Sequence, residues 1–392
     1  MKILIVDDDE DSRGLLQRFL TLLGHEVVAA ENGEKAWDLV KTLEIRFVIS
    51  DWMMPVMNGL ELCQRIRSAD LPFYCYVMLL TAKGTKEALI EGMSAGADDF
   101  LAKPFNREEL EVRVRAGERV VGLEQKLLAQ QTKVQQAYTK LSLDLEAAAQ
   151  LQKSLLPCQD MTLGGIRFDW LFHPSSFIGG DIFNFFQIDD YQTGFYLLDV
   201  VGHGVSAAMR SVTISQVLSM GANGIFLKNP SSTFLDFTSP AKLVRELNLY
   251  FQSAGDLDEH FTMVYGVFDR RRNCLTFTQA GHPYPIYVKE NEAPALLGQG
   301  GFSVGMFSDV DYEEVVVDFQ EGDRLCIYSD GIPDCLNKDN LNFSTERLRG
   351  LMQSGKEKPV KNLLTDLERD LRTWRGDDQF DDDISCLLLE AM

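Results

Sequence analysis

The sequence lacks long apolar runs. None of its runs approaches the roughly 20 apolar residues that a membrane-spanning helix needs. The opening residues MKILIVDDDE also lack a signal-peptide pattern, because acidic residues follow the short apolar run at once. We therefore expect a cytoplasmic protein with no membrane partner.

Basic residues are scarce: 38 lysines and arginines stand against 59 aspartates and glutamates, which gives a net charge of −21. No basic cluster offsets this charge, so we expect no binding to nucleic acid or anionic lipid. Part of the excess lies in two acidic clusters, residues 7–11 and 377–383, each beside an apolar strand-like run. Acidic runs are usually solvated faces, but carboxylates at strand ends also suit oxygen-loving cations.

Paired cysteines are missing too. The seven cysteines are scattered, odd in number and free of any Cys-x-x-Cys spacing. This pattern indicates neither a disulfide framework nor a thiolate zinc site. We expect most of them to be inert core residues.

Glycine and proline are absent between Gly122 and Pro157, within a stretch from about Asn106 to Leu156 that is rich in good helix formers. Apolar residues recur there at every seventh position, and Gln130 and Asp144 interrupt a second apolar row. The pattern predicts a long helix that pairs with a second copy as a coiled coil, which makes a homodimer; the alternative is a solvated spacer helix. The first row is Val120, Leu127, Val134, Leu141, Ala148 and Leu155, and the second includes Leu123, Ala137 and Leu151.

The length of 392 residues exceeds one ordinary core. Two domains and a connector are expected: residues 1–120, a helical linker at 121–156, and residues 157–392. Before the linker, strand-like and helix-like segments alternate, which predicts an α/β domain with a doubly wound, five-stranded parallel sheet. Its strands are expected at Ile3–Val6, Val27–Ala30, Phe47–Ser50, Tyr76–Leu80 and Asp99–Leu101, and its helices near Ser12–Leu23, Glu34–Thr42, Gly59–Ala69, Lys86–Ala95 and Glu108–Arg119.

Five polar residues stand at the carboxyl ends of these strands. Asp7 and Asp8 follow the first strand, Asp51 the third, Thr81 the fourth and Lys103 the fifth. Functional sites of such sheets lie outside the carboxyl ends of the strands, so these side chains are expected to converge at one rim.

With the motifs VDD, SDWMMPVMNG, LLTA and KPF in this order, residues 1–120 resemble the receiver domain of two-component response regulators. The resemblance implies that Asp51 accepts a phosphoryl group from a sensor histidine kinase. It also implies that Mg²⁺ binds beside it, held by Asp7, Asp8, Asp51 and the carbonyl of Met53. Carboxylates suit this ion, which neutralises charge during phosphoryl transfer.

The same resemblance gives three further residues a role. Lys103 would pair with the acyl phosphate, and Thr81 would donate a hydrogen bond to it. Phe100 would occupy the aromatic switch position, although an aromatic residue there can simply be core. A cis peptide bond is implied between Lys103 and Pro104.

Beyond Pro157, strand-like segments predominate, with helical patterns between them. They predict an α+β domain in which packed antiparallel sheets are covered by helices. Strands are expected at Ile166–His173, Asp181–Ile188, Thr193–Val200, Phe261–Asp269, Cys274–Ala280, Pro285–Lys289, Glu313–Phe319, Asp323–Tyr328 and Ile384–Glu390, and helices at Ser206–Met220, Pro240–Ser253 and Val360–Arg375.

Acidic residues at the ends of these segments stand within three positions of glycine or next to another acid: Asp181, Asp199, Asp330 and the pair Asp382 and Asp383. Glycine lets the backbone approach a metal ion closely. One Asp-Gly pair would be an ordinary turn, but acids at four such places in one sequence indicate a metal site.

With LQKSLLP, IGGD, LLDVVGHGVSAA, AGHPYP, YSDGIPD and FDDDIS, this region resembles the SpoIIE-type branch of the protein phosphatase 2C-like metal-dependent phosphatases. The resemblance implies a β-sandwich between helical layers, two Mn²⁺ or Mg²⁺ ions, and hydrolysis of phosphoserine or phosphothreonine. The implied ligands are Asp181, Asp199, Asp330, Asp382 and the carbonyl of Val200, whereas Asp383 need not be a direct ligand. Two such cations activate a shared water and neutralise the phosphate that it attacks.

Other residues and segments near these motifs differ from the metal ligands. Asn184 stands where many relatives carry an acid, which predicts a weaker auxiliary contact. His203, between two glycines, is either an acid toward the leaving oxygen or a residue that shapes a turn, and His282 is best interpreted as structural. Residues 221–238 are expected to form a flap.

Taken together, the two resemblances imply a response regulator whose output is a protein serine/threonine phosphatase. Its expected substrate is the phosphoserine form of an anti-sigma factor antagonist in a partner-switching pathway. The alternative is a catalytically weak adaptor or scaffold that binds a sigma factor or an anti-sigma partner.

The interrupted heptad pattern generates a first prediction. Replacing Gln130 and Asp144 with leucine completes the second apolar row, so the double variant is expected to dimerise more tightly. Sedimentation equilibrium on the full chain measures this. Unchanged self-association would contradict pairing through this helix and would favour a spacer helix.

Overall fold

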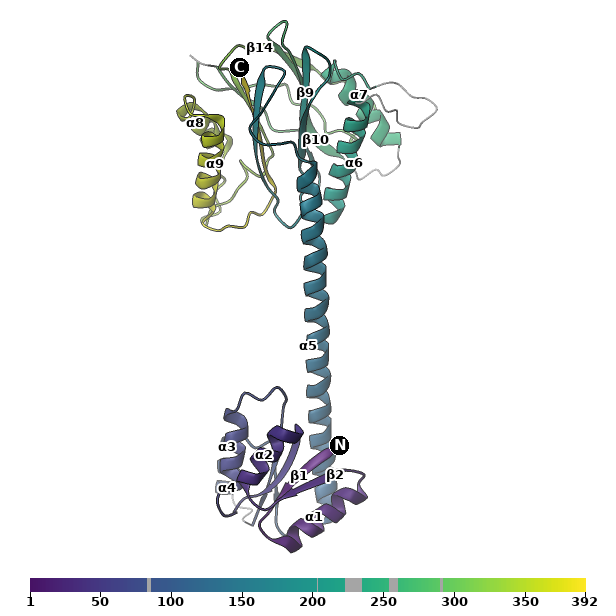
Figure 1. Ribbon diagram of the computed structural model, residues 1–392, viewed down its shortest axis with the longest axis vertical. Coiled ribbons are helices and arrows are strands. Elements are labelled where there is room, and N and C mark those ends of the chain that lie inside the picture. The colour runs from purple at the N-terminus through teal and green to yellow at the C-terminus, as the bar shows by residue number, and fades with distance from the viewer. Residues whose placement is uncertain (83–85, 203, 223–234, 254–259, 290–291) are drawn as a thin grey trace. The chain divides into compact units, whose positions relative to one another are not determined.

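The computed structural model describes residues 1–82, 86–202, 204–222, 235–253, 260–289 and 292–392. The chain folds into two compact units, Met1–Lys140 and Leu141–Met392. Each unit is described by itself below (Figure 1). Within the described residues, none of the helices combines the length and the apolar character that a membrane span requires.

The first unit contains the expected doubly wound sheet. Its five strands pair in parallel in the order β2-β1-β3-β4-β5. The strands are β1 (Lys2–Val6), β2 (Glu26–Ala30), β3 (Phe47–Asp51), β4 (Tyr76–Thr81) and β5 (Asp99–Ala102), and the helices between them are α1 (Glu10–Leu22), α2 (Gly33–Leu43), α3 (Gly59–Ser68) and α4 (Lys86–Ser94).

Local sequence signals set where the first helices begin. The side chain of Asp9 caps α1, and that of Asn32 caps α2, each by accepting a hydrogen bond from a backbone N–H of the first turn. Asn58 and Glu61 form a reciprocal capping box at the start of α3. Because a separate apolar core covers each face of the sheet, the strands between them are held rigidly, with their carboxyl ends at one edge.

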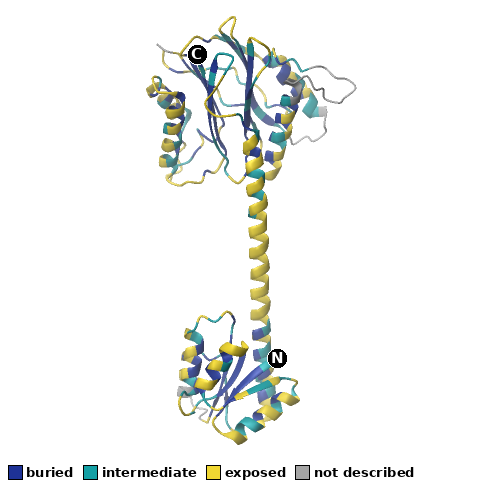
Figure 2. Cartoon of the chain, viewed as in Figure 1, coloured by how far each residue is buried: buried dark blue, intermediate teal, exposed yellow. Residues whose placement is uncertain are grey.

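Helix α5 (Arg107–Leu155) confirms the long helix expected from the sequence. Its beginning is packed: Leu110, Val114 and Val121 are buried in one core of the first unit. Apolar residues further along are exposed, among them Leu127 and Val134 (Figure 2). Exposed apolar positions in heptad register are compatible with pairing to a second copy, which stays a prediction.

The second unit is a sandwich of two antiparallel sheets. One sheet has the order β14-β11-β10-β9-β8 and the other the order β13-β12-β15-β16-β7-β6. The strands are β6 (Met161–Leu163), β7 (Ile166–His173), β8 (Ile182–Gln187), β9 (Gln192–Val200), β10 (Phe261–Asp269), β11 (Cys274–Ala280), β12 (Ile286–Val288), β13 (Ala295–Leu296), β14 (Glu314–Asp318), β15 (Arg324–Tyr328) and β16 (Ile384–Ala391).

Helices cover both outer faces of this sandwich (Figure 1). Helices α6 (Val205–Ala222) and α7 (Pro240–Ser253) contribute to the same core as the two sheets, and α8 (Thr345–Ser354) and α9 (Val360–Arg375) share a second core with β15 and β16. The sequence patterns did not predict α8, β6 or β13. Helix α8 is mostly polar, and it is fixed by burial of Leu348 and Met352 in the second core.

Both faces of strand β15 are buried, which explains why its sequence is almost continuously apolar. Leu325 and Ile327 point into the core between the sheets, whereas Cys326 and Tyr328 point into the core beneath α8 and α9. Side chains alternate between the two faces of a strand, so both faces are buried here.

Two glycines of α5 generate a matched prediction. A Cβ on Gly117 would lie 2.4 Å from the ring of Phe47 and 2.7 Å from that of Tyr76, both buried, whereas a Cβ on Gly122 would meet nothing within 4 Å. Gly117→Ala is expected to destabilise the first unit by about 1–3 kcal/mol through overpacking. Gly122→Ala should stabilise the helix by about 0.5–1 kcal/mol. Urea unfolding followed by circular dichroism checks both, and equal effects would contradict the packing of α5.

Candidate functional site

The rim of the parallel sheet brings three carboxylates together. Ligand oxygens of Asp7, Asp8 and Asp51 all lie within 4.8 Å of one another. Asp7 follows β1 and is 1% exposed, and Asp51 ends β3, the strand beside it. This donor set fits a magnesium ion, because hard divalent cations prefer carboxylate oxygens.

Lys103 supplies positive charge to this rim. Its Nζ lies 2.8 Å from Asp7 Oδ2 and 2.5 Å from Asp51 Oδ1. Burial raises the pKa of Asp51, and the hydrogen bond and charge of Lys103 oppose that rise. The Lys103–Pro104 peptide bond is cis, and the N–H of Lys103 donates to the carbonyl of Thr81 at 2.7 Å. Thr81 is buried at the end of β4, beside these groups.

Other residues named from the receiver motifs lie close by. Met53 is exposed, and its N–H donates to Asp51 Oδ2 at 3.3 Å. The side chain of Phe100 is half-buried, with the guanidinium of Arg113 5.6 Å from its ring centre. Gly59 follows in the same loop, where a Cβ would lie 2.2 Å from the carbonyl oxygen of Asp51. The glycine therefore lets α3 begin directly against the end of β3.

In the second unit, four acids come from the ends of facing strands. Asp181 directly precedes β8 and Asp199 lies near the end of β9, which pair in one sheet. Asp330 follows β15, and Asp382 precedes β16, which pair in the other sheet. Among the described residues, the group of three acids whose ligand atoms all lie within 4.8 Å of one another is the receiver trio, not a set from these four.

Asp181 is the most unusual of these acids. It is 1% exposed, and neither of its carboxylate oxygens accepts a hydrogen bond of ordinary geometry from a described residue, although Ser329 and Ser385 lie near. A buried carboxylate without such partners is costly unless a cation pairs with it. The donor chemistry therefore fits a divalent metal ion at this position.

Burial and mutual repulsion raise the pKa values of Asp181 and Asp199. Burial is the main cause that raises the pKa of Asp181 well above its usual range, and the charge of Asp199 adds to it. Burial also raises the pKa of Asp199 to about 7, followed by the charges of Asp330 and Asp382. These mutual effects indicate that the four acids share one electrostatic site.

Asp383 has a different task. Its Oδ1 accepts hydrogen bonds from the N–H and hydroxyl of Ser175, at 2.7 and 2.9 Å, and its Oδ2 accepts from the N–H of Gly180 at 2.6 Å. With both oxygens engaged, it anchors the loop that precedes Asp181. The sequence carried no signal for Ser175, whose partner lies 208 positions away.

The glycines beside the acids make room for this anchor. A Cβ on Gly179 would lie 2.5 Å from Asp383 Oδ2. A Cβ on Gly331 would lie 2.1 Å from the carbonyl oxygen of Asp383. A Cβ on Gly180 would lie 2.9 Å from the carbonyl oxygen of Val200, the expected ligand. Close packing within the loop cluster thus requires these glycines.

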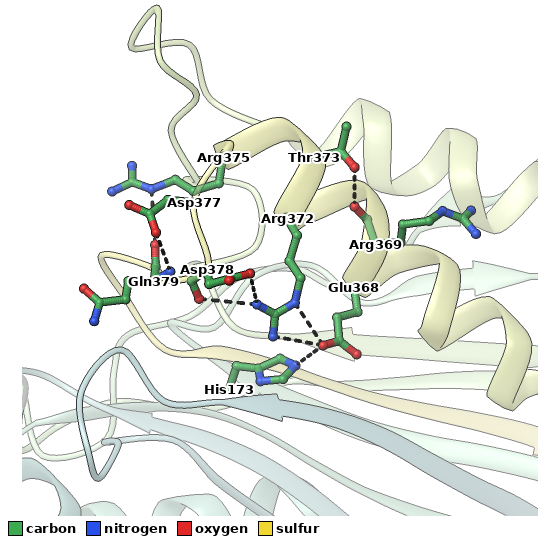
Figure 3. Close-up of polar contacts among 9 residues, drawn as sticks. All are labelled: His173, Glu368, Arg369, Arg372, Thr373, Arg375, Asp377, Asp378 and Gln379. Carbon is green, nitrogen blue, oxygen red and sulfur yellow. Dashed lines mark hydrogen bonds and ion pairs between the residues drawn. The ribbon is translucent and has the colours of Figure 1, made fainter.

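Arginines of α9 hold part of the remaining acidic cluster, residues 377–381, and Figure 3 shows Arg372 paired with Asp378. Arg372 Nη1 lies 2.9 Å from Asp378 Oδ1, and Arg375 Nη2 lies 2.6 Å from Asp381 Oδ1. Arg372 also contacts Glu368, which lies 2.9 Å from His173 Nε2. These pairs are structural, so only the end of the acidic cluster belongs to the candidate metal site.

Two further expectations concern side chains near the motifs. Asn184 Oδ1 accepts a hydrogen bond from the N–H of Phe185 at 2.8 Å, so its carbonyl is already engaged. His282 is buried, with Nδ1 2.7 Å from the hydroxyl of Thr262, and burial lowers the pKa of His282 to about 3. It is therefore neutral and structural. His203 and most of the expected flap, residues 223–234, lie outside the described residues.

One buried residue in the LQKSLLP motif received no role from the sequence. Gln152, near the end of α5, makes two hydrogen bonds to the backbone of Gly179, 27 positions away. Its burial among exposed neighbours is visible only in the folded chain.

Comparisons with known proteins agree with this division of the chain. Residues 3–115 match the family described as response regulator receiver domain, and residues 189–391 match the family described as stage II sporulation protein E.

Individual relatives cover parts of the chain. The phosphoserine phosphatase RsbP of Bacillus subtilis is 28% identical over 195 residues, which are 49% of this chain and 45% of the relative. The response regulator MprA of Mycolicibacterium vanbaalenii is 42% identical over 118 residues, which are 30% of this chain and 49% of the relative. The chain thus spans about half the length of these two relatives.

A solved structure shares the fold of the second unit. The SiaA-PP2C domain of Pseudomonas aeruginosa superposes with a TM-score of 0.55 at 20% identity, and the match covers 65% of this chain and 98% of that domain.

The raised pKa values generate a prediction for the metal-free protein. The folded pKa of Asp199, about 7, exceeds the ordinary 3.8, so its stabilising contribution is present at low pH and is lost as the pH rises toward 7. Asp181 acts in the same direction. Calorimetry in EDTA is expected to show the unfolding temperature of the second unit falling between about pH 5 and pH 8.

Two controls accompany this experiment. Saturating Mn²⁺ should abolish the fall, since bound cations neutralise the carboxylates. Asp199→Asn should reduce it, because the amide does not ionise. A metal-free unfolding temperature that rises over this pH range would contradict the assigned environment of the two acids.

Proposed function

The chain belongs to the stage II sporulation protein E family and carries a response regulator receiver domain before it, and we propose that it is a metal-dependent protein serine/threonine phosphatase controlled by phosphorylation of Asp51. The proposed domain limits are 1–120 for the receiver, 121–156 for the linker and 157–392 for the phosphatase. The observation that carries the proposal is the buried carboxylate of Asp181, without ordinary hydrogen-bond partners, in one electrostatic site with three further acids.

The phosphatase residues have distinct proposed roles. Asp181, Asp199, Asp330, Asp382 and the carbonyl of Val200 hold two Mn²⁺ or Mg²⁺ ions. Such ions supply a water that ionises near neutral pH and positive charge that neutralises the phosphate. Asp383 acts indirectly: its carboxylate accepts a hydrogen bond from the N–H of Gly180, next to Asp181, and its own N–H donates to Asp382 Oδ1.

The receiver residues provide the proposed control. Asp51 accepts the phosphoryl group from a sensor histidine kinase, with Asp7, Asp8 and the carbonyl of Met53 holding Mg²⁺ beside it. Lys103 contacts Asp51, so it can form an ion pair with the phosphoryl group once Asp51 is phosphorylated. Thr81 hydrogen-bonds the new phosphate.

The proposed substrate is a phosphoserine protein, specifically the phosphorylated form of an anti-sigma factor antagonist. Support for phosphoserine comes from the relative described as a phosphoserine phosphatase. A homodimer through α5 is also proposed, since apolar residues in heptad register are exposed along it, including Leu127, Val134 and Leu141.

An activity assay tests this function. The full chain is incubated with a phosphoserine-labelled antagonist protein and Mn²⁺, and phosphate release is followed with and without EDTA. Asp330→Asn is expected to lower the rate by at least about 100-fold, since even the residues behind a metal ligand cost about 10–100-fold when removed. Beryllofluoride, which mimics the acyl phosphate, should change the wild-type rate and leave that of Asp51→Asn unaltered.

The matched control is Asp378→Asn. Asp378 belongs to the same acidic cluster, but it is exposed and paired with Arg372, so its replacement should leave the rate unchanged. Full activity of Asp330→Asn would overturn the proposed metal site. Binding of the antagonist without any turnover would favour an adaptor instead.

A further inference from the structure

The last turns of α5 bury one polar side chain. Gln152 is 4% exposed, whereas its neighbours Gln150, Leu151 and Lys153 are exposed. Burial of a carboxamide is costly unless both its oxygen and its nitrogen find partners. Gln152 finds both in one other residue.

That residue is Gly179. The Nε2 of Gln152 donates to the carbonyl of Gly179 at 2.7 Å, and its Oε1 accepts from the N–H of Gly179 at 3.1 Å. The carboxamide thus pairs with both the N–H and the carbonyl of Gly179, in the way that two residues pair in an antiparallel sheet. A carboxamide suits this role because it carries one acceptor and one donor group in the same plane at every pH.

Gly179 opens the loop that carries the buried metal ligand. The next residue, Gly180, donates its N–H to Asp383, and the one after is Asp181. On the side of the missing Cβ, Gly179 faces the carboxylate of Asp383 at a distance that excludes any side chain. Gly179 is therefore held between the amide of Gln152 and the carboxylate of Asp383.

We propose that Gln152 is a positioning residue of the metal site: by clamping Gly179, the end of α5 sets the position of Asp181. This inference rests on the proposed two-metal function. It assigns a physical junction between the helix and the ligand loop, so that a shift of the helix end acts directly on metal affinity. A residue that merely closed the helix would instead affect stability alone.

Mn²⁺ affinity distinguishes the two roles. Titration calorimetry is performed on the full chain in an Asp8→Ala background, which removes one receiver carboxylate, and the second-unit signal is identified as the one lost in Asp330→Asn. Gln152→Ala is expected to weaken this binding by about 10–100-fold, the usual effect of removing a residue behind a ligand. Gln150→Ala, the same substitution at an exposed position on the same helix, should leave the affinity unchanged.

Gln152→Glu provides a second variant if the alanine variant fails to fold. It keeps the acceptor for the N–H of Gly179 but places an oxygen against the carbonyl. Added negative charge alone would strengthen cation binding, whereas loss of positioning weakens it. We expect weaker binding, and unfolding in EDTA checks that each variant is folded before metal is added.

The outcomes separate the two hypotheses. Wild-type affinity in both Gln152 variants would overturn the positioning role, whatever the enzyme activity. A second outcome is that both variants bind Mn²⁺ more weakly, while the wild-type chain binds Mn²⁺ but hydrolyses no phosphoserine. This outcome would support the positioning role of Gln152 and overturn the proposed phosphatase function. Absence of any Mn²⁺ binding that depends on Asp330 would overturn both.

Discussion

Carboxylates crowded at the ends of strands repel one another, and each unit of this chain is organised around that repulsion. In the first unit the amine of Lys103 touches two acids of the trio, so part of the charge is already balanced. In the second unit Asp181 is buried with its oxygens unpaired by any ordinary hydrogen bond of a described residue. Burial, followed by the charge of Asp199, raises the pKa of Asp181 well above its usual range.

The rest of each fold serves to hold the acids in spite of this cost. Parallel strands deliver the first set to one rim, and two facing antiparallel sheets deliver the second. Asp383 shows how this is done locally, because both of its carboxylate oxygens accept hydrogen bonds from the loop that leads to the buried Asp181. One acid thus stabilises the loop, and different acids are available to bind a metal ion.

Much of this arrangement could be predicted from the sequence, because its signals are local. The structure has strands that end at or next to Asp7, Asp51 and Thr81, as the sequence pattern predicts. It also has a long helix over the stretch that is free of glycine and proline. Helix α8 could not be predicted, since its few apolar residues become meaningful only against the core that they enter. The partnership of Gln152 with Gly179 crosses 27 positions and follows no spacing rule.

The glycines beside the acids also have a second reason besides the one that the sequence suggests. Their expected purpose was to let backbone approach a cation. For Gly179 and Gly331, the nearest atoms belong to Asp383. A glycine in the sequence looks the same whether its missing side chain leaves space for an ion or for a neighbouring loop.

The double burial of β15 and β16 has a consequence for how the second unit comes apart. Each of these strands feeds alternate side chains into two cores, so neither core can loosen without disturbing the pairing of the same two strands. Asp330 and Asp382 extend from that pair, and their alignment is lost with it. The two helical layers and the acid cluster therefore form a single cooperative unit, in which partial melting of either layer would dismantle the site rather than leave it intact on a weakened scaffold.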